Sequence, residues 1–166
     1  MLQMKLCGDL TLREHCAPVG EITADILANM DEMVEMMRAQ NGVGLAAPQV
    51  GITKCFLVMM NPENEQVFKM INPKILSRSD KTVIMEEGCL SVLGSDNLPV
   101  YADVARPEKV VVEWTDENGK KQMAEMSGIC ARIVQHETDH LDGVLFIDYL
   151  SPVKREMVMR KVRRRK

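Results

Sequence analysis

Two histidines four residues apart, with a glutamate directly after the first, form the part of this sequence that most plainly specifies chemistry. The segment reads Q-H-E-T-D-H-L-D-G and contains His136, Glu137 and His140. Residues four apart on a helix share one face, so both imidazoles can bind a single metal ion. Glu137 can then act as general base toward a water that the metal activates. The spacing therefore predicts a metal-dependent hydrolytic site.

A catalytic site of this kind needs a third protein ligand and one open position. The class with a third histidine six residues after the second is excluded, because Phe146 stands there. Glu156 is one alternative, although it lies in a run dense with lysine and arginine. Cys89, in E-E-G-C-L-S, is the other, since a bound metal converts a thiol to the thiolate ligand. We favour Cys89 as a ligand over Cys89 as a small core residue, and a Cys/His₂ set by itself favours zinc.

The elements that must position these residues follow from hydrophobic periodicity and turn signals. Residues 21–40 have an amphipathic pattern that predicts a helix, and the glycine-rich residues 41–51 predict a loop. A helix over 127–141 carries both histidines, and Ser151 and Pro152 begin a third helix. Short strands are predicted at 55–60, 67–71, 82–86, 109–115, 120–126 and 144–147, with a hairpin turn at Asn118 and Gly119.

Strands and helices do not alternate regularly along the chain, so we expect an α+β fold. In this fold, antiparallel strands pack around a central helix that carries H-E-x-x-H, with an N-terminal helix and a C-terminal helix. A length of 166 residues, with 46% hydrophobic and 27% charged residues, fits a single catalytic domain over 1–166. Most of the 14 methionines are expected in its core, where they fill irregular gaps.

Cysteine usage and the first residues indicate the compartment. The five cysteines are odd in number and include no C-x-x-C pair, so a reducing cytoplasm fits better than a disulfide framework. The first twenty residues lack the apolar stretch of a secretory signal, and no apolar run is long enough to cross a bilayer. We therefore expect a cytoplasmic protein without membrane contact.

Charge is distributed unevenly along the chain. Residues 154–166 hold eight Lys or Arg and one acid, a net +7, which leaves −10 for the remainder. A basic tail on an acidic body is typical of proteins that contact a polyanion such as RNA. One hypothesis is therefore a module that is not an enzyme, folded around a metal and docked on RNA or a ribosome. The plainer interpretation is a frayed helix end that only aids solubility.

Three motifs in order make the chain resemble the peptide deformylases, metal enzymes that remove the formyl group from initiator methionine. The motifs are G-V-G-L-A-A-P-Q at 42–49, E-G-C-L-S at 87–91 and H-E-T-D-H at 136–140. The likeness spans nearly the whole chain. It implies hydrolysis of N-formyl-methionyl peptides on nascent chains, with release of formate. A metal-dependent peptidase or another amidase is the alternative enzyme for such a site.

The resemblance implies a role for each matching residue. The metal ligands would be Cys89, His136 and His140. The metal would be Fe²⁺ by resemblance, with Zn²⁺, Ni²⁺ or Co²⁺ as substitutes in a purified sample. A metal-bound water would attack the formyl carbon, while Glu137 accepts its proton and passes it to the leaving amine. The Gln49 side chain and the Leu90 backbone N–H would stabilise the oxygen of the tetrahedral intermediate.

The same likeness suggests a pocket for the methionine side chain. It would be lined by Val43, Gly44, Ile129, Ile133 and the aliphatic stem of Arg132, although Ile129 also fits an ordinary core position. Arg106 would pair with Glu87 behind the ligand loop. Residues 95–99 are extra relative to the family pattern and would lie near the substrate groove, so peptide preference beyond the methionine is open. Residues 154–166 would be a candidate ribosome contact.

Overall fold

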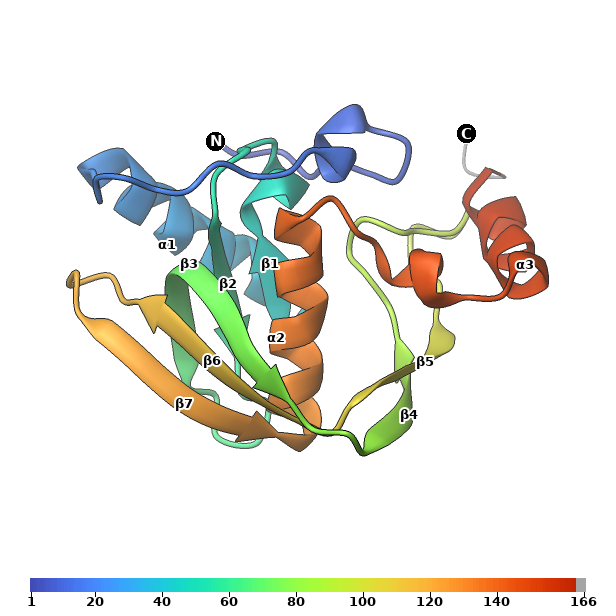
Figure 1. Cartoon of the computed structure of the whole chain (residues 1–166). Coiled ribbons are helices and arrows are strands. Elements are labelled where there is room, and N and C mark those ends of the chain that lie inside the picture. Colours follow the sequence, from blue (N-terminus) through green and yellow to red (C-terminus); the bar gives the residue numbers. More distant parts are fainter. Residues whose placement is uncertain (164–166) are drawn as a thin grey trace.

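The computed structural model describes residues 1–163 (Figure 1). Its α-helices are α1 (Ala24–Ala39), α2 (Gly128–Leu141) and α3 (Pro152–Arg163). Short 3-10 turns form η1 (Leu10–Arg13), η2 (Ala47–Val50) and η3 (Phe146–Tyr149). All three helices expected from the sequence are thus present, and residues 164–166 of the predicted basic tail lie outside the described part.

Antiparallel pairing joins the strands into two sheets. The larger has the order β1-β2-β3-β6-β7, and the smaller pairs β4 with β5. The strands are β1 (Gly44–Ala46), β2 (Phe56–Met60), β3 (Val67–Arg78), β4 (Thr82–Glu87), β5 (Ala102–Pro107), β6 (Lys109–Thr115) and β7 (Lys121–Ser127). The expected hairpin joins β6 to β7, and in its turn Gly119 has φ +77°. Separate helices with antiparallel sheets confirm the α+β fold class.

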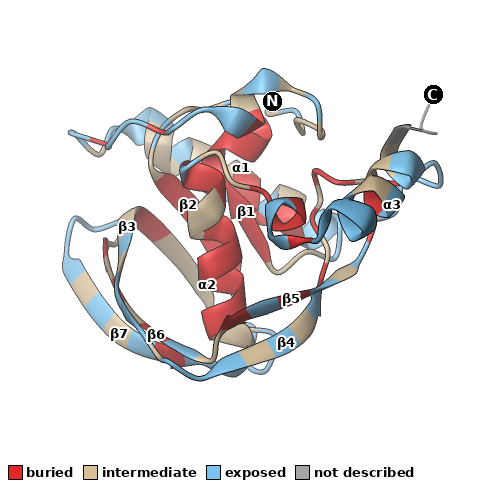
Figure 2. Ribbon diagram, turned by 45° about the vertical axis from the view of Figure 1, so that its right-hand side comes forward, coloured by how far each residue is buried: buried red, intermediate tan, exposed pale blue. Residues whose placement is uncertain are grey.

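Helix α2 runs through the middle of the fold, and Figure 2 shows it mostly in the colour of buried residues. Nine of its 14 residues are buried, and five of those nine are polar or charged. Burying polar groups costs free energy unless they find partners, so these five side chains need hydrogen-bond or charge partners inside the protein. The helix ends at Leu141, shortly before Gly143 as expected. Gly143 has φ +73°, and its N–H donates to the His140 carbonyl at 3.2 Å.

The core confirms the expected role of methionine. Met30, Met33 and Met37 recur on one face of α1 and are fully buried against the larger sheet. Met59 of β2 and Met70 of β3 are fully buried in a second cluster, which also includes residues of α2. The apolar stripe of the first helix therefore faces the core, as its spacing predicts.

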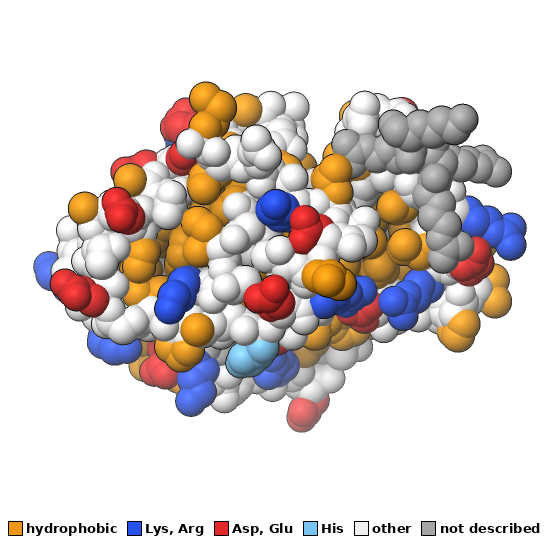
Figure 3. Space-filling model, turned by 90° about the horizontal axis from the view of Figure 1, so that it is seen from above, with side chains coloured by type: hydrophobic (Ala, Val, Ile, Leu, Met, Phe, Trp, Pro, Cys, Tyr) orange, Lys and Arg blue, Asp and Glu red, His pale blue; other side chains and the backbone are white. Residues whose placement is uncertain are grey.

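Helix α3 begins in the expected way and packs on the smaller-sheet side of the molecule. Ser151 directly precedes Pro152, the first residue of α3, and its Oγ accepts the Lys154 N–H at 3.4 Å. Val158 is buried in a cluster with Phe146 of η3. Seen from above, basic side chains lie on the surface at the right-hand end of the molecule, the end that carries α3 (Figure 3).

The structure corrects three details of the predicted elements. Residues 41–51, expected to be a loop, contain β1 and η2, because a strand of three residues is too short to give a periodic pattern. Strand β5 is not predicted, since its Ala, Asp and Pro residues are uncommon in strands. Residues 144–147 are not a strand: Phe146 and Ile147 are buried through η3 in an apolar cluster, without joining a sheet.

Candidate metal centre and catalytic site

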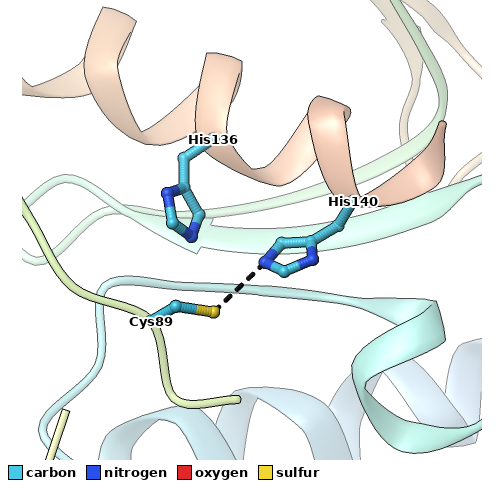
Figure 4. A group of neighbouring side chains, drawn as sticks. All are labelled: Cys89, His136 and His140. Atoms are coloured by element: carbon cyan, nitrogen blue, oxygen red, sulfur yellow. Dashed lines mark hydrogen bonds between the residues drawn. The ribbon is translucent and has the colours of Figure 1, made fainter. Parts of the chain in front are cut away.

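One thiol and two imidazoles converge in the interior of the protein (Figure 4). His136 and His140 extend from α2, and Cys89 lies in the turn that follows β4. One ligand atom from each residue lies within 4.8 Å of the others, and Cys89 Sγ is 3.3 Å from His140 Nε2. All three residues are buried. The structure thus brings together the ligand set that the sequence suggested.

Hydrogen-bond donors surround the sulfur of Cys89. The Ser91 N–H donates to Sγ at 3.4 Å, and Gln49 Nε2 donates to it at 3.5 Å. Such donors stabilise negative charge on sulfur, and the thiolate is the form that binds a metal. The Val92 N–H donates to the Cys89 carbonyl at 2.9 Å, so the turn that carries the thiol is closed by its own backbone.

A buried carboxylate sets the orientation of His136. Glu87 Oε1 lies 2.8 Å from His136 Nδ1. An ionised carboxylate only accepts, so Nδ1 carries the proton and Nε2 is the nitrogen left for a metal. Burial opposes ionisation of Glu87, but hydrogen bonds from His136 and Arg106 outweigh it and lower its pKa to about 2. The carboxylate is therefore charged at any pH at which the protein would work.

Two buried arginines hold Glu87 in place. Arg106 donates through Nε at 2.7 Å and through Nη2 at 3.0 Å, which is the pairing expected from the sequence. Arg132 donates to the same carboxylate through Nη1 at 2.7 Å. A buried charge needs such compensation, and here one carboxylate receives it from β5 and from α2 together.

His140 is suited to bind a metal in its neutral form. Burial lowers the pKa of its imidazole well below the usual range. Its Nδ1 is buried and has no hydrogen-bond partner within residues 1–163. Phe146, which stands where another metal-binding class has its third histidine, instead stacks on His136 with ring centroids 6.0 Å apart.

Glu137 lies between the two histidines in sequence and lines the adjoining cavity. Its Oε2 is buried, with no hydrogen-bond partner in the described part of the chain. Burial is the largest influence on this carboxyl and raises its pKa to about 7. A group with this pKa can take up and release a proton near neutral pH, which is what a general base requires.

The side-chain amide of Gln49 is fixed at both ends. Its Oε1 accepts the Ala46 N–H at 2.9 Å, and its Nε2 donates to Ser91 Oγ at 3.1 Å. The amide nitrogen therefore faces the thiol turn and not the solvent. Leu90, next to Cys89 in that turn, lines the same cavity as Gln49.

A cavity of about 390 Å³ adjoins the candidate ligands. The five residues expected around the methionine side chain all line it: Val43, Gly44, Ile129, Arg132 and Ile133. Ile129 also packs against the core, so it can be a core residue and line the cavity at the same time. The sequence does not predict the contacts of the Arg132 guanidinium. This group donates to the Val104 carbonyl at 2.8 Å and to the Val83 carbonyl at 2.6 Å. This side chain joins α2 to both strands of the smaller sheet.

Leu98, Pro99 and Tyr101 also line the cavity. Leu98 and Pro99 fall within the extra residues 95–99, which were the only feature of the sequence that pointed to this side of the cavity. Glu156, the alternative third ligand, lies on α3 with Arg160 Nε at 3.5 Å. It is not one of the three residues whose ligand atoms converge among the described residues.

The fold and the site together define a class: α+β hydrolases with an H-E-x-x-H helix and a cysteine beside it. The polypeptide deformylase family model matches residues 1–156 of this chain. The chain belongs to that family, whose members are metal-dependent hydrolases that remove N-formyl groups. The enzyme class expected from the sequence is thereby confirmed.

Individual relatives cover almost the whole chain. A peptide deformylase of Rhizobium meliloti (strain 1021) is 44% identical over 156 residues, covering 92% of this chain and 87% of the relative. One of Thermodesulfovibrio yellowstonii is 39% identical and covers 100% of this chain and 99% of the relative. The crystal structure of peptide deformylase from Ehrlichia chaffeensis superposes with a TM-score of 0.91 at 35% identity, covering 98% and 95%.

A second similar solved structure is that of a complex. The peptide deformylase from Synechococcus elongatus in complex with actinonin matches with a TM-score of 0.88 and 38% identity, over 97% of this chain and 85% of that one.

Within residues 1–163, no helix has the length and apolar character needed to traverse a bilayer.

Proposed function

We propose that the protein removes the N-formyl group from the initiator methionine of nascent polypeptides and releases formate. The observation that carries the proposal is the convergence of the three candidate ligands beside a buried glutamate, at the wall of a cavity. Nascent chains are made in the cytoplasm, so this function implies a cytoplasmic location. We also propose that the chain acts as one catalytic domain.

Cys89, His136 and His140 would hold one divalent metal ion, Fe²⁺ by the resemblance, with Zn²⁺, Ni²⁺ or Co²⁺ as alternatives. The fit is supported by the donor set and by the neutral, buried imidazole of His140. When bound, such an ion polarises a carbonyl oxygen and lowers the pKa of bound water far below that of bulk water, to about 7. The remaining steps are carried by side chains and backbone of this chain.

Glu137 would act as general base and then as general acid. Its carboxylate would accept a proton from the water that attacks the formyl carbon, and would return that proton to the amine that leaves. A pKa of about 7 suits both transfers, because neither protonation state is strongly disfavoured at neutral pH. The unpaired Oε2 is the oxygen available for this exchange.

Gln49 and Leu90 would stabilise the oxygen that becomes negative when water adds to the formyl carbon. The amide of Gln49 is oriented by its hydrogen bonds to the Ala46 N–H and to Ser91 Oγ. Its second N–H, now directed at Cys89 Sγ over 3.5 Å, would donate to that oxygen. The backbone N–H of Leu90 would be the second donor, one residue after the thiol. Removing one such donor in other enzymes lowers kcat by about 10²–10³-fold.

The peptide would lie between two strand edges. β1 is the edge of the larger sheet and β4 belongs to the smaller sheet, and residues in or beside both line the cavity. An extended peptide could add its backbone hydrogen bonds to such edges. The methionine side chain would enter the pocket lined by Val43, Gly44, Ile129, Arg132 and Ile133.

A single substitution tests the chemistry. Glu137→Gln keeps the size of the side chain but cannot accept the proton, so formate release from a formyl-methionyl peptide should fall at least about 10²-fold. Metal content, measured on the same anaerobically purified sample, should stay unchanged. Glu125→Gln, on the exposed face of β7, is the matched control and should keep its rate. Retention of most activity by Glu137→Gln would refute the general-base role.

Substrate choice separates this proposal from a general amidase. Formylated, acetylated and unblocked peptides of the same sequence should be compared side by side. The proposal expects turnover of the formylated peptide alone, whereas a peptidase or broad amidase would cleave internal or acetylated amides at comparable rates.

A further inference from the structure

One wall of the cavity is made of exposed apolar side chains. Leu98 is 62% exposed and Tyr101 is 57% exposed, and both line the cavity together with Pro99. Large apolar side chains exposed beside a binding site are typical of surfaces that a ligand covers. The cavity is also lined by residues of α2 and of the segment that leads into β1.

The segment that presents Leu98 is a closed turn with defined hydrogen bonds. The Gly94 N–H donates to the Leu98 carbonyl at 2.9 Å, and the Asn97 N–H donates to the Gly94 carbonyl at 3.1 Å. Asp96 Oδ1 accepts the Leu98 N–H at 3.1 Å. Asn97 adopts the left-handed conformation, with φ +61°, that this turn requires. The backbone of Leu98 is thus held through both its N–H and its carbonyl.

The base of this turn is anchored in the core. Val92 and Val100 are buried in the cluster that includes Phe146, and the Val100 N–H donates to the Val92 carbonyl at 2.9 Å. Tyr101 lies against Gly88: a Cβ built on Gly88 would be 2.8 Å from Tyr101 Cδ1. Gly88 directly precedes Cys89. The apolar wall is therefore attached to the turn that carries the candidate thiol ligand.

We propose that Leu98 and Tyr101 select peptides with a large apolar side chain within the two residues that follow the formyl-methionine. The inference rests on the proposed function and names a narrower substrate class for it. An extended peptide leaving the candidate metal centre presents successive side chains on alternate sides. One of the first two downstream side chains can therefore cover the apolar wall. Glu86, which also lines the cavity, opposes an acidic side chain there.

The experiment measures kcat/KM for two series of peptides with the metal-loaded enzyme. In formyl-Met-Xaa-Ala and formyl-Met-Ala-Xaa, Xaa is Leu, Ser or Asp. At one of the two positions, the wild-type protein should favour Leu over Ser by about tenfold, and should disfavour Asp further. Leu98→Ser should reduce the Leu-over-Ser ratio about threefold or more, because the apolar contact is lost. Leu98→Met, which preserves that contact, should retain the ratio.

Two controls separate this inference from the function on which it rests. Leu76→Ser alters another exposed leucine, on β3, that does not line the cavity, and should leave every ratio unchanged. Formyl-Met-Ala-Ala reports basal deformylation in each variant. If wild-type protein turns over this peptide but shows no Leu preference at either position, or if Leu98→Ser keeps the wild-type ratio, the apolar-wall inference is wrong. If no formylated peptide is turned over, the proposed function itself fails.

Discussion

Gly44 and Glu137 are packed so closely that position 44 has no room for a side chain. A Cβ built on Gly44 would lie 2.8 Å from both Cγ and Cδ of Glu137. Gly42 stands in the same relation to Leu90, whose Cδ1 would be 2.8 Å from an added Cβ. The two glycines of the first motif thus lie against two residues of the proposed catalytic apparatus, which gives the G-x-G spacing a physical reason.

Gly44→Ala should displace the carboxylate of Glu137. Misplacing a reacting group by about 1 Å costs on the order of 10²-fold in rate, so kcat should fall by about that factor. Steady-state formate release would measure the change in kcat, and the urea midpoint of unfolding would measure any change in stability separately. Gly20→Ala is the matched control, because nothing lies within 4 Å of a Cβ at that position and its rate should not change. A normal kcat in Gly44→Ala would show that Glu137 can move without loss.

Arg132→Met should destabilise the protein more than loss of a surface arginine. The substitution leaves Glu87 buried with one arginine partner in place of two and frees two backbone carbonyls. Breaking a buried ion pair typically costs about 3–5 kcal/mol in free energy of unfolding. Urea titration would measure this, with Arg38→Met as control, since Arg38 is half-exposed and its pair with Glu35 spans 4.0 Å.

A double-mutant cycle tests whether the cost comes from Glu87. Glu87→Gln removes the charge that Arg132 compensates, so Arg132→Met should cost less in that background than in the wild type. Equal costs in both backgrounds would show that the backbone contacts of Arg132, and not its pairing with Glu87, carry the stability.

Removing metal should lower thermal stability in a way that depends on Cys89. A ligand bound only to the folded state stabilises it by about 2.7 kcal/mol when present at 100 times its Kd. Treatment with a chelator should therefore lower the Tm of wild-type protein, and adding back a divalent metal should restore it. The Tm of Cys89→Ser should change little on chelation or on adding metal back. Cys130→Ser alters a half-buried cysteine on α2, and its Tm should respond as that of wild type does. A wild-type Tm that is indifferent to chelation would count against a resident metal.

Asp148 should contribute stability that disappears in acid. Burial opposes its ionisation, but hydrogen bonds from Arg13 and from the Leu145 N–H outweigh it and hold its pKa below the usual range. Because the pKa is lower in the folded state, the contribution is complete above the unfolded value of about 3.9 and is lost as pH falls through the folded value. Asp148→Asn should cost about 1 kcal/mol at pH 7, and the difference from wild type should shrink below about pH 4. Urea midpoints of both proteins would be measured across that pH range. A stability difference that stays constant below about pH 4 would contradict the proposed contribution of the Asp148 carboxylate.

The basic helix α3 offers a separate test of ribosome contact. Deleting 154–166 would remove the buried Val158 and disturb the core, so point substitutions are preferable. Lys154→Ala with Lys161→Ala removes two exposed charges and should weaken ribosome co-sedimentation at low salt, while activity on free peptides is retained. The difference from wild type should shrink as salt rises, because the wild-type protein loses more charge-dependent affinity. Unchanged co-sedimentation would speak against α3 as the anchor.

Local patterns predicted all three helices and five of the seven strands, but not β1 or β5. The helix with both candidate ligands was predictable because a four-residue spacing places two side chains on one helix face. The distant Cys89 was identified through the motif and the need for a third ligand, and the pairing of Arg106 with Glu87 through resemblance. The guanidinium contacts of Arg132 were not predictable, since they depend on how β4 and β5 approach α2. Strand β5 itself lacks the apolar alternation from which that approach could be inferred.

The smaller sheet has a consequence for how the protein can diversify. Within the described chain, β4 and β5 pair only with each other, and the arginine–glutamate cluster fastens them to α2. Cys89 and the exposed apolar residues of the cavity thus lie on the segment that joins β4 to β5, whereas His136 and His140 lie on α2. We therefore expect insertions beyond Gly94 to change which polypeptides the candidate site accepts, while the three convergent side chains keep their positions.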